Sequence, residues 1–136
     1  MSVKESTMTE AKRKKVLIVE DTDSVQMMMK RWVSNAGYDV ILAADGREAL
    51  EKAQQEIPDL VLLDVMMPEM NGFAVCRELR SYDAMKKTPV IIVTALPNSA
   101  DSEEAKMSGA NEVVIKPTNA NDLIGRVRRY LGSAFK

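Results

Sequence analysis

Acidic, hydroxyl and lysine side chains follow directly after short apolar runs at four points along the sequence. Glu20 and Asp21 follow one such run, and Asp64 follows another. Thr94 and Lys116 come at the ends of two more. Carboxylate oxygens are ligands of hard cations such as Mg²⁺, and an ammonium group and a hydroxyl suit a phosphoryl group. These residue types indicate metal and phosphoryl chemistry, provided that the fold brings them together.

The residue types that are missing exclude several other kinds of site. The chain has no histidine and one cysteine, Cys76. A histidine general base, a Ser-His or Cys-His nucleophile pair and a histidine-ligated zinc or haem site are therefore excluded, as is an internal disulfide. These two counts suit a reducing cytoplasm, which is the predicted location.

Charge and hydrophobicity argue against nucleic acid and membrane as direct partners. The 19 basic and 20 acidic residues give a net charge of −1, without the positive field that non-specific nucleic-acid binding requires. The apolar runs are far shorter than the roughly 18 residues of a membrane span and too short for a signal-peptide core. We expect no direct nucleic-acid contact and no membrane insertion.

The 136 residues have the size of one domain, and the order of apolar and polar segments divides them into three parts. Residues 1–14 are polar and are predicted to form a flexible tail. The domain is expected over 15–133, and 134–136 form the C-terminal end. Since no room is left for an output module, we expect the chain to act as a stand-alone unit that signals through a binding partner.

Short apolar runs alternate with longer amphipathic stretches throughout the predicted domain. This alternation is typical of strand and helix units around a parallel sheet. Most of the runs are continuously apolar, as expected of strands that helices cover on both faces. The predicted strands are 15–20, 39–43, 60–63, 90–93 and 112–115.

Five helices are predicted, one after each strand. The first begins at an N-cap, Asp23 or Ser24, and Gly37 follows it as a C-terminal cap. The second begins at Asp45, and the last begins at the Asn119 cap and continues to about residue 131. The third and fourth are expected over about 72–81 and 99–108. The inward face of the first helix is predicted to hold Val25, Met28, Met29, Trp32, Val33 and Ala36.

The predicted α/β arrangement indicates where the acidic residues lie and what they could bind. Ligands of open parallel sheets bind at the carboxyl ends of the strands, beside the point where strand order reverses. If the first and third strands are neighbours, Glu20, Asp21 and Asp64 converge. Two like charges ~4 Å apart repel by about 4 kcal/mol at an effective dielectric near 20, so such a cluster needs a cation. Oxygen ligands favour Mg²⁺, and Lys116 with Thr94 would complete a phosphoryl pocket.

This set of residues resembles the receiver domain of two-component response regulators, in particular the stand-alone receivers of chemotaxis. The resemblance covers about residues 15–131 and rests on four motifs in the family's order and spacing. They are VLIVED at 16–21, LLDVMMPEMNG at 62–72, VTA at 93–95 and IKP at 115–117. The resemblance implies a doubly wound, five-stranded parallel sheet of order 2-1-3-4-5, a flavodoxin-like three-layer sandwich with five helices.

The resemblance also implies a role for each site residue. Asp64 would be the phosphoacceptor, taking a phosphoryl group from the histidine of a sensor kinase or phosphotransfer protein. Mg²⁺ would be the cofactor, held by Glu20, Asp21, Asp64 and the backbone carbonyl of Met66. Lys116 would pair with the phosphoryl oxygens, and Thr94 would bond to one of them and draw its loop inward. The Lys116–Pro117 bond is usually cis in this family.

Three residues depart from the family pattern or set its rates. The switch aromatic three residues before the lysine is replaced by Val113. Dephosphorylation is tuned two residues beyond the phosphoacceptor and two beyond the threonine, where this chain has Met66 and Leu96. Neither side chain can orient an attacking water, so we expect slow loss of the phosphoryl group and a long-lived signal.

Three functions follow from these observations. The first is a phosphorylatable receiver, not an enzyme in the ordinary sense, whose downstream protein target binds the face of the fourth helix, fifth strand and fifth helix. The second is a non-switching receiver used for docking, which Val113 favours. The third is a metal-dependent phosphohydrolase, which the lack of an aspartate at the position of Met66 disfavours. The kinase, the target and the pathway are not predicted.

Overall fold

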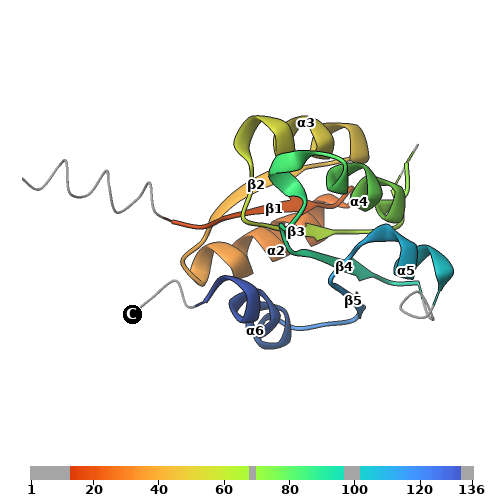
Figure 1. Ribbon diagram of the computed structural model, residues 1–136. Helices are drawn as coiled ribbons and strands as arrows, with labels where there is room; N and C mark the ends of the chain where they lie inside the picture. The colour runs from red at the N-terminus through yellow and green to blue at the C-terminus, as the bar shows by residue number, and fades with distance from the viewer. Residues whose placement is uncertain (1–12, 68–69, 97–101, 133–136) are drawn as a thin grey trace, which may run out of the picture.

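The structure is a computed structural model of the chain and describes residues 13–67, 70–96 and 102–132. Five parallel strands form one sheet in the order β2-β1-β3-β4-β5, as the family resemblance implied (Figure 1). Their bounds are β1 (Lys15–Val19), β2 (Asp39–Ala43), β3 (Leu60–Leu63), β4 (Val90–Thr94) and β5 (Glu112–Ile115). The predicted strands agree to within one residue at each end.

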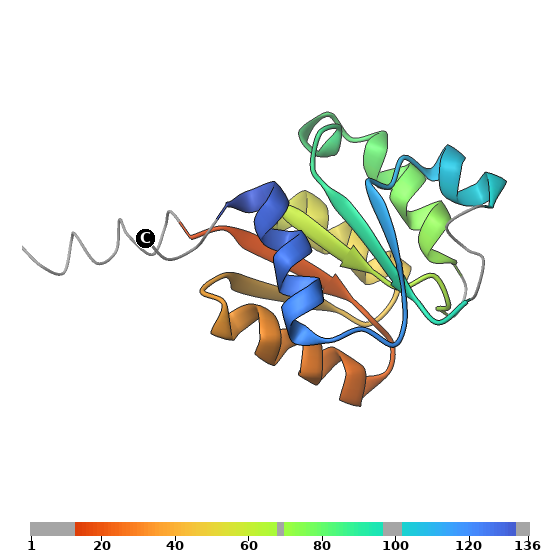
Figure 2. The ribbon, with the colours of Figure 1, turned by 90° about the horizontal axis from the view of Figure 1, so that it is seen from below.

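Helices cover both faces of the sheet and make a three-layer sandwich. Helices α2 (Asp23–Asn35) and α6 (Ala120–Leu131) lie side by side on one face, in front of the sheet in Figure 2. Helices α3 (Gly46–Glu56), α4 (Gly72–Arg80) and α5 (Glu103–Ser108) lie on the other face (Figure 1). A short 3₁₀ helix, η1 (Asp83–Met85), follows α4 and was not predicted.

Two hydrophobic cores explain why the strand sequences are continuously apolar. Alternate residues of a strand point to opposite faces of its sheet. In β1, Leu17 and Val19 pack under α3, α4 and α5, whereas Val16 and Ile18 pack under α2 and α6. All four side chains are buried, as are those of β3. Fully burying one such side chain contributes about 1.5–3 kcal/mol, so the two cores hold the sheet between its helix layers.

Three of the predicted caps are confirmed and one is wrong. Gly37 follows α2 with a φ of 99°, the left-handed geometry of a C-terminal cap. Asp45 accepts a hydrogen bond from the Glu48 amide at 2.8 Å, and Asn119 accepts one from the Asp122 amide at 2.8 Å. Helix α2 is capped by neither Asp23 nor Ser24. Its N-cap is Thr22, whose side chain makes no capping bond, because Asp23 already has helical backbone geometry.

The prediction that Met28 lies on the inward face of the first helix is also wrong, because 42% of this residue is exposed. The apolar stripe of α2 is wider than the face that the sheet covers. Met28 lies at its margin, on a pocket of about 510 Å³ that Trp32, Pro117 and Leu123 also line.

Parts of the predicted organisation lie outside the described residues. These are residues 1–12 of the predicted tail, the C-terminal end at 134–136 and the first residues predicted for the helix at 99–108. The described part of that helix begins at Glu103, where Ser102 caps it by accepting a bond from the Ala105 amide. None of the helices in the described ranges combines the length and the apolar character that a membrane span requires.

Candidate functional site

Strand register places two of the acidic residues beside each other. In the β1–β3 pair, Val19 lies opposite Leu63, so Glu20 and Asp64 are the next residues of two adjacent strands. The Asp64 amide donates to the Val19 carbonyl at 3.1 Å, which continues the pairing past the end of β3. Two continuous apolar runs in register therefore bring these carboxylates to one edge of the sheet.

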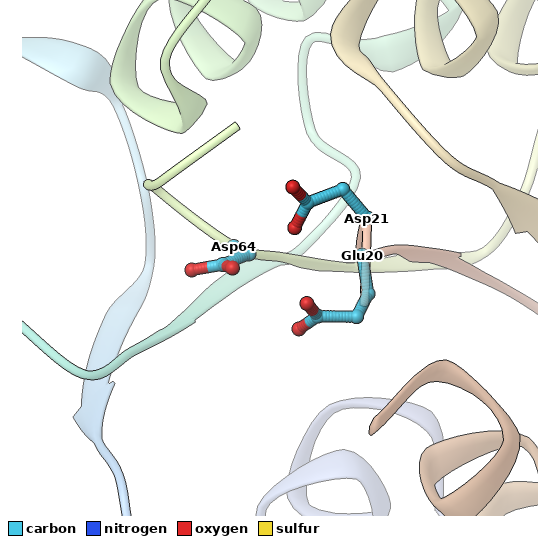
Figure 3. Close-up of side chains that lie close together, drawn as sticks. All are labelled: Glu20, Asp21 and Asp64. Carbon is cyan, nitrogen blue, oxygen red and sulfur yellow. The ribbon is translucent and has the colours of Figure 1, made fainter. Parts of the chain in front are cut away.

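Three carboxylates form a compact cluster at this edge. One oxygen from each of Glu20, Asp21 and Asp64 lies within 4.8 Å of the others, and Figure 3 shows the three side chains around a common space. Glu20 is 2% exposed and Asp64 is 7% exposed, whereas Asp21 is exposed. Burial removes the water that would screen their repulsion, so the cluster favours a cation.

Lys116 supplies a positive charge from the end of β5. Its Nζ lies 3.0 Å from Glu20 Oε1 and 3.9 Å from Asp64 Oδ2. Its amide donates to the Thr94 carbonyl at 2.7 Å, and the Lys116–Pro117 bond is cis, as the family resemblance implied. The closer partner of the ammonium is thus Glu20, which leaves the Asp64 carboxylate only partly compensated.

The pKa of Asp64 is raised above its ordinary value. Burial is the main cause, and the negative charge of Glu20 adds to it. Lys116 and the amides of Met66 and Val65 act in the opposite direction but do not cancel the shift. The Met66 amide donates to Asp64 Oδ1 at 3.3 Å. An added cation or neutralisation of the carboxylate would therefore relieve the unfavourable charge of Asp64.

Thr94 lies at the end of β4, one strand away from Asp64. It is fully buried, and its Oγ1 accepts a hydrogen bond from the Leu96 amide at 3.2 Å. This bond ties the threonine to the loop that follows β4. The structure thus places the hydroxyl at the same edge of the sheet as the acids.

Met66 and Leu96 line a cleft of about 490 Å³ beside the acidic cluster, together with Asp21 and Glu104. Met66 is 56% exposed and Leu96 is 36% exposed. Val113, the replacement for the expected aromatic, is partly buried and packs against the core under α3, α4 and α5. The cleft beside the acids is therefore lined by exposed apolar side chains, those of Met66 and Leu96, together with acidic ones.

Gln26 contributes to the site, and sequence analysis did not predict this role. Its side-chain amide donates to the Glu20 carbonyl at 3.1 Å and to the Ala43 carbonyl at 3.2 Å. It ties the first turn of α2 to the ends of β1 and β2. The Thr22 amide also donates to Glu20 Oε2 at 3.2 Å. A glutamine on a polar helix face carries no signal of such a contact, because the same residue is usual on solvated faces.

The donor set fits a hard divalent cation. Three carboxylates with no nitrogen or sulfur donor favour Mg²⁺ over zinc or copper. The cluster has one exposed member, so an ion bound there keeps contact with water, as Mg²⁺ requires. The acidic pocket is therefore compatible with Mg²⁺.

Comparison with known proteins assigns the family. The family model of the response regulator receiver domain matches residues 16–128. The chain belongs to this family. It is thus the receiver domain of a two-component response regulator, with a CheY-like fold.

Curated relatives of this receiver domain are about twice as long. A protein of Cyanophora paradoxa, described as probable transcriptional regulator ycf27, is 42% identical over 122 residues, covering 90% of this chain and 50% of its own. The alkaline phosphatase synthesis transcriptional regulatory protein PhoP of Bacillus subtilis is 38% identical over 118 residues, covering 87% and 48%. The chain spans about half the length of the curated relatives it matches.

Solved structures similar to this receiver domain match it over nearly their whole length. The chemotaxis protein CheY4 of Vibrio cholerae has a TM-score of 0.82 and 37% identity, covering 87% of this chain and 98% of its own. The receiver domain of the sensor histidine kinase PA1611 of Pseudomonas aeruginosa has a TM-score of 0.81 and 30% identity, covering 89% and 99%. That structure has a magnesium ion coordinated in the active-site cleft.

Proposed function

We propose that Asp64 of this receiver domain accepts a phosphoryl group from the histidine of a sensor kinase or phosphotransfer protein. A carboxylate oxygen of Asp64 forms a bond to phosphorus while the phosphorus–nitrogen bond to the donor imidazole breaks. The observation that supports this most is the cluster of Glu20, Asp21 and Asp64 beside Lys116. The domain thus acts as a phosphoacceptor signalling protein, and it catalyses only its own phosphorylation and dephosphorylation.

Each neighbouring group has a role in this proposal. Glu20, Asp21, Asp64 and the Met66 carbonyl would hold Mg²⁺, which neutralises charge on the transferring group. Lys116 reaches both buried carboxylates and compensates the charge of the phosphoryl oxygens. The Thr94 hydroxyl donates a hydrogen bond to one of those oxygens. This bond draws the loop that contains Leu96 toward the site, because the Leu96 amide is bonded to Thr94 Oγ1. The positions of these groups supply the catalysis, since phosphoryl transfer depends mainly on alignment and charge.

A phosphorylation assay tests the proposal directly. The protein is incubated with Mg²⁺ and a small-molecule phosphodonor, and its intact mass is followed for wild type, Asp64→Asn and Asp83→Asn. Asp83 is an acid at the opposite edge of the sheet whose side chain is 99% exposed, so it is a matched control. One added phosphoryl group in wild type and Asp83→Asn, but not in Asp64→Asn, supports the proposal. No adduct favours the docking module, and donor turnover without an adduct favours a phosphohydrolase.

We further propose that the phosphoryl group is lost slowly. Met66 and Leu96 occupy the rim of the cleft beside the acids, and neither side chain has a polar group that could orient water. The double variant Met66→Asn with Leu96→Glu supplies such groups and should lose its label faster than wild type. Equal rates of loss would contradict this assignment.

For the output, we propose that a downstream protein binds the face formed by α5, β5 and α6. Met107 is 68% exposed and Ile115 is 37% exposed, which provides apolar contact area on α5 and β5. Amide chemical shifts measured before and after phosphorylation decide whether this face switches. Shifts that spread to α5, β5 and α6 support a switch without the aromatic. Shifts confined to the site favour the non-switching docking module, in line with Val113.

A further inference from the structure

Gly72 lies against the peptide group of the proposed phosphoacceptor. It is the first residue of α4 and is buried. A Cβ atom at this position would fall on the Asp64 carbonyl oxygen, and would lie 2.9 Å from both the Asp64 carbonyl carbon and the Val65 Cα. These are backbone atoms, so no flexible side chain can move aside. Residue 72 therefore has no room for a side chain unless Asp64 or α4 shifts.

Helix α4 is firmly held in this position. The Gly72 amide donates to the Val65 carbonyl at 2.9 Å, and Asn71 caps the helix by accepting a bond from the Ala74 amide at 3.0 Å. The helix also buries a row of apolar side chains, Phe73, Val75, Cys76 and Leu79. Crowding at residue 72 is therefore relieved by the loop after β3 more easily than by the helix.

The same loop carries the groups that the proposed reaction uses. The Asp64 amide is bound to the Val19 carbonyl on the β1 side, and Asp64 Oδ1 accepts from the Met66 amide on the other side. A displaced Asp64–Val65 peptide therefore changes the direction of the Asp64 carboxylate. It also moves the Met66 carbonyl, the proposed backbone ligand of Mg²⁺.

We propose that Gly72 is a positioning residue for phosphoryl transfer. Its lack of a side chain lets the start of α4 pack on the Asp64 peptide and fix the carboxylate in the direction required for attack. This inference rests on the proposed function of Asp64. Loss of alignment on the scale of 1 Å costs about a hundredfold in rate, so a methyl group at this position has a measurable effect.

Gly72→Ala tests the inference, with Gly46→Ala as its matched control. A Cβ at Gly46 would also press on α4 and on the residue before its cap, but through side-chain atoms only, Val75 Cγ2 at 2.8 Å and Met70 Cβ at 3.3 Å, and not through the Asp64 backbone. Each variant is also made together with Gly125→Ala, because a Cβ at Gly125, in the middle of α6, would have no atom within 4 Å beyond the adjoining backbone of its own helix. Alanine there stabilises the helix and keeps a weakened variant folded.

Three quantities are measured per folded molecule. They are the limiting phosphorylation rate at saturating Mg²⁺, the small-molecule donor concentration for half that rate, and the amide chemical shifts of residues 64–67. We expect Gly72→Ala to lower the limiting rate by about ten- to a hundredfold. The half-saturating donor concentration should change little, and the shift changes should centre on residues 64–67. The limiting rate of Gly46→Ala should stay within about twofold of wild type, because its clash does not involve the reacting atoms.

Each contrary result has a distinct meaning. A Gly72→Ala rate near that of wild type, or an equal loss in Gly46→Ala, overturns the positioning role. Failure of Gly72→Ala to fold even beside Gly125→Ala overturns it too, because the glycine is then a requirement of folding. Absence of an adduct in the wild type itself overturns the proposed function, and this inference with it.

Discussion

At the amino ends of the strands, charged side chains are hydrogen bonded to the backbone, whereas at the carboxyl ends the buried carboxylates of Glu20 and Asp64 share one ammonium group. The Asp59 carboxylate accepts from the Lys15 amide at 2.7 Å, and the Lys15 ammonium donates to the Glu56 carbonyl at 2.6 Å. The Asp59 amide in turn donates to the Lys15 carbonyl at 2.8 Å. These bonds join the start of β1 to the loop before β3.

Arg80 connects several segments at the amino ends of the strands. Its guanidinium donates to the Gly109 carbonyl, to the carbonyls of Met85 and Thr88, and to Asn111 Oδ1. The Asn111 oxygen also accepts from the Val90 amide at 2.9 Å, at the start of β4. One side chain thus joins the end of α4 to the segments that lead into β4 and β5.

The difference shows how the domain separates stability from chemistry. At the amino ends, each of these charged groups meets dipoles that favour its charge. At the carboxyl ends, the raised pKa of Asp64 shows that its charged form is disfavoured by burial. Reactive sites retain such unfavourable arrangements because the ligand or reaction relieves them, and the rest of the fold offsets their cost.

The largest effect is expected at the amino ends. Arg80→Ala should lower the free energy of unfolding by about 3 kcal/mol, because it leaves partly buried carbonyl groups without their donor. Urea unfolding measures the loss. Arg77→Ala, on the exposed side of the same helix, should change stability by less than about 0.5 kcal/mol. A phosphorylation rate that falls in Arg80→Ala as steeply as the stability would break the proposed separation.

The second prediction concerns stabilisation by Mg²⁺ at the carboxyl ends of the strands. Mg²⁺ should raise the melting temperature of wild type, because it relieves repulsion among the three carboxylates and binds only the folded state. At about ten times its dissociation constant the gain is about 1.4 kcal/mol. Asp64→Asn should show a smaller gain, since it has one charged ligand fewer. A melting temperature that stays constant across millimolar Mg²⁺ would count against a three-acid metal site.

Without metal, Asp64→Asn should stabilise the domain by on the order of 1 kcal/mol at neutral pH. The pKa of Asp64 is raised in the folded state, so its contribution to stability is fully present below its unfolded pKa and is lost as pH rises through the folded pKa. The advantage of Asn over Asp should therefore disappear in acid. Thermal melts in EDTA across pH measure this difference.

Asp122 offers a control of opposite sign. Hydrogen bonds from Arg126 and Thr118 lower its pKa, so its contribution is present above the unfolded pKa and is lost as pH falls. Asp122→Asn should therefore lower stability at neutral pH and not in acid. If Asp64→Asn followed the same trend as Asp122→Asn, the carboxylate of Asp64 would not be the unfavourable group we describe.

The smallest expected change in stability concerns Ile57, a strained residue at the otherwise well-bonded amino ends of the strands. Ile57 ends α3 in the left-handed region, with a φ of 47°, which is unfavourable for a β-branched residue. Half of the side chain is exposed, so Ile57→Gly removes strain and little burial. We expect a gain of about 1 kcal/mol by urea unfolding, against no gain for Ile57→Val. A lower free energy of unfolding in Ile57→Gly would show that contacts of the Ile57 side chain stabilise the fold by more than its backbone conformation costs.

The sequence predicted the strands, and the polar residues at their carboxyl ends, because both depend on local patterns. A strand that is buried on both faces has to be continuously apolar, and the residue after it falls at the edge of the sheet. Glu20, Asp64 and Lys116 could be assigned to the site on this basis, with the family resemblance supplying their roles. The strand order also came from that resemblance, since apolar runs do not encode which strands are neighbours.

The features that were missed depend on contacts between distant segments. Arg80 at the end of a helix is indistinguishable in sequence from a solvated arginine, yet its acceptor at Gly109 lies 29 residues away. The closer approach of Lys116 to Glu20 than to Asp64 likewise follows from side-chain packing. The exposure of Met28 depends on how far the sheet extends under α2. None of these has a periodic signature.

The pairing of Val19 with Leu63 has a consequence for the order in which the site assembles. Its carboxylates come from the ends of β1 and β3, which lie next to each other in the sheet, while its ammonium comes from β5, two strands further from β1. During refolding, the proposed metal ligands therefore require only the N-terminal half of the chain to be in register. The Glu20–Lys116 ion pair requires the last strand as well. Rapid-mixing measurements of Mg²⁺ binding and of this ion pair would time the two halves of the domain separately.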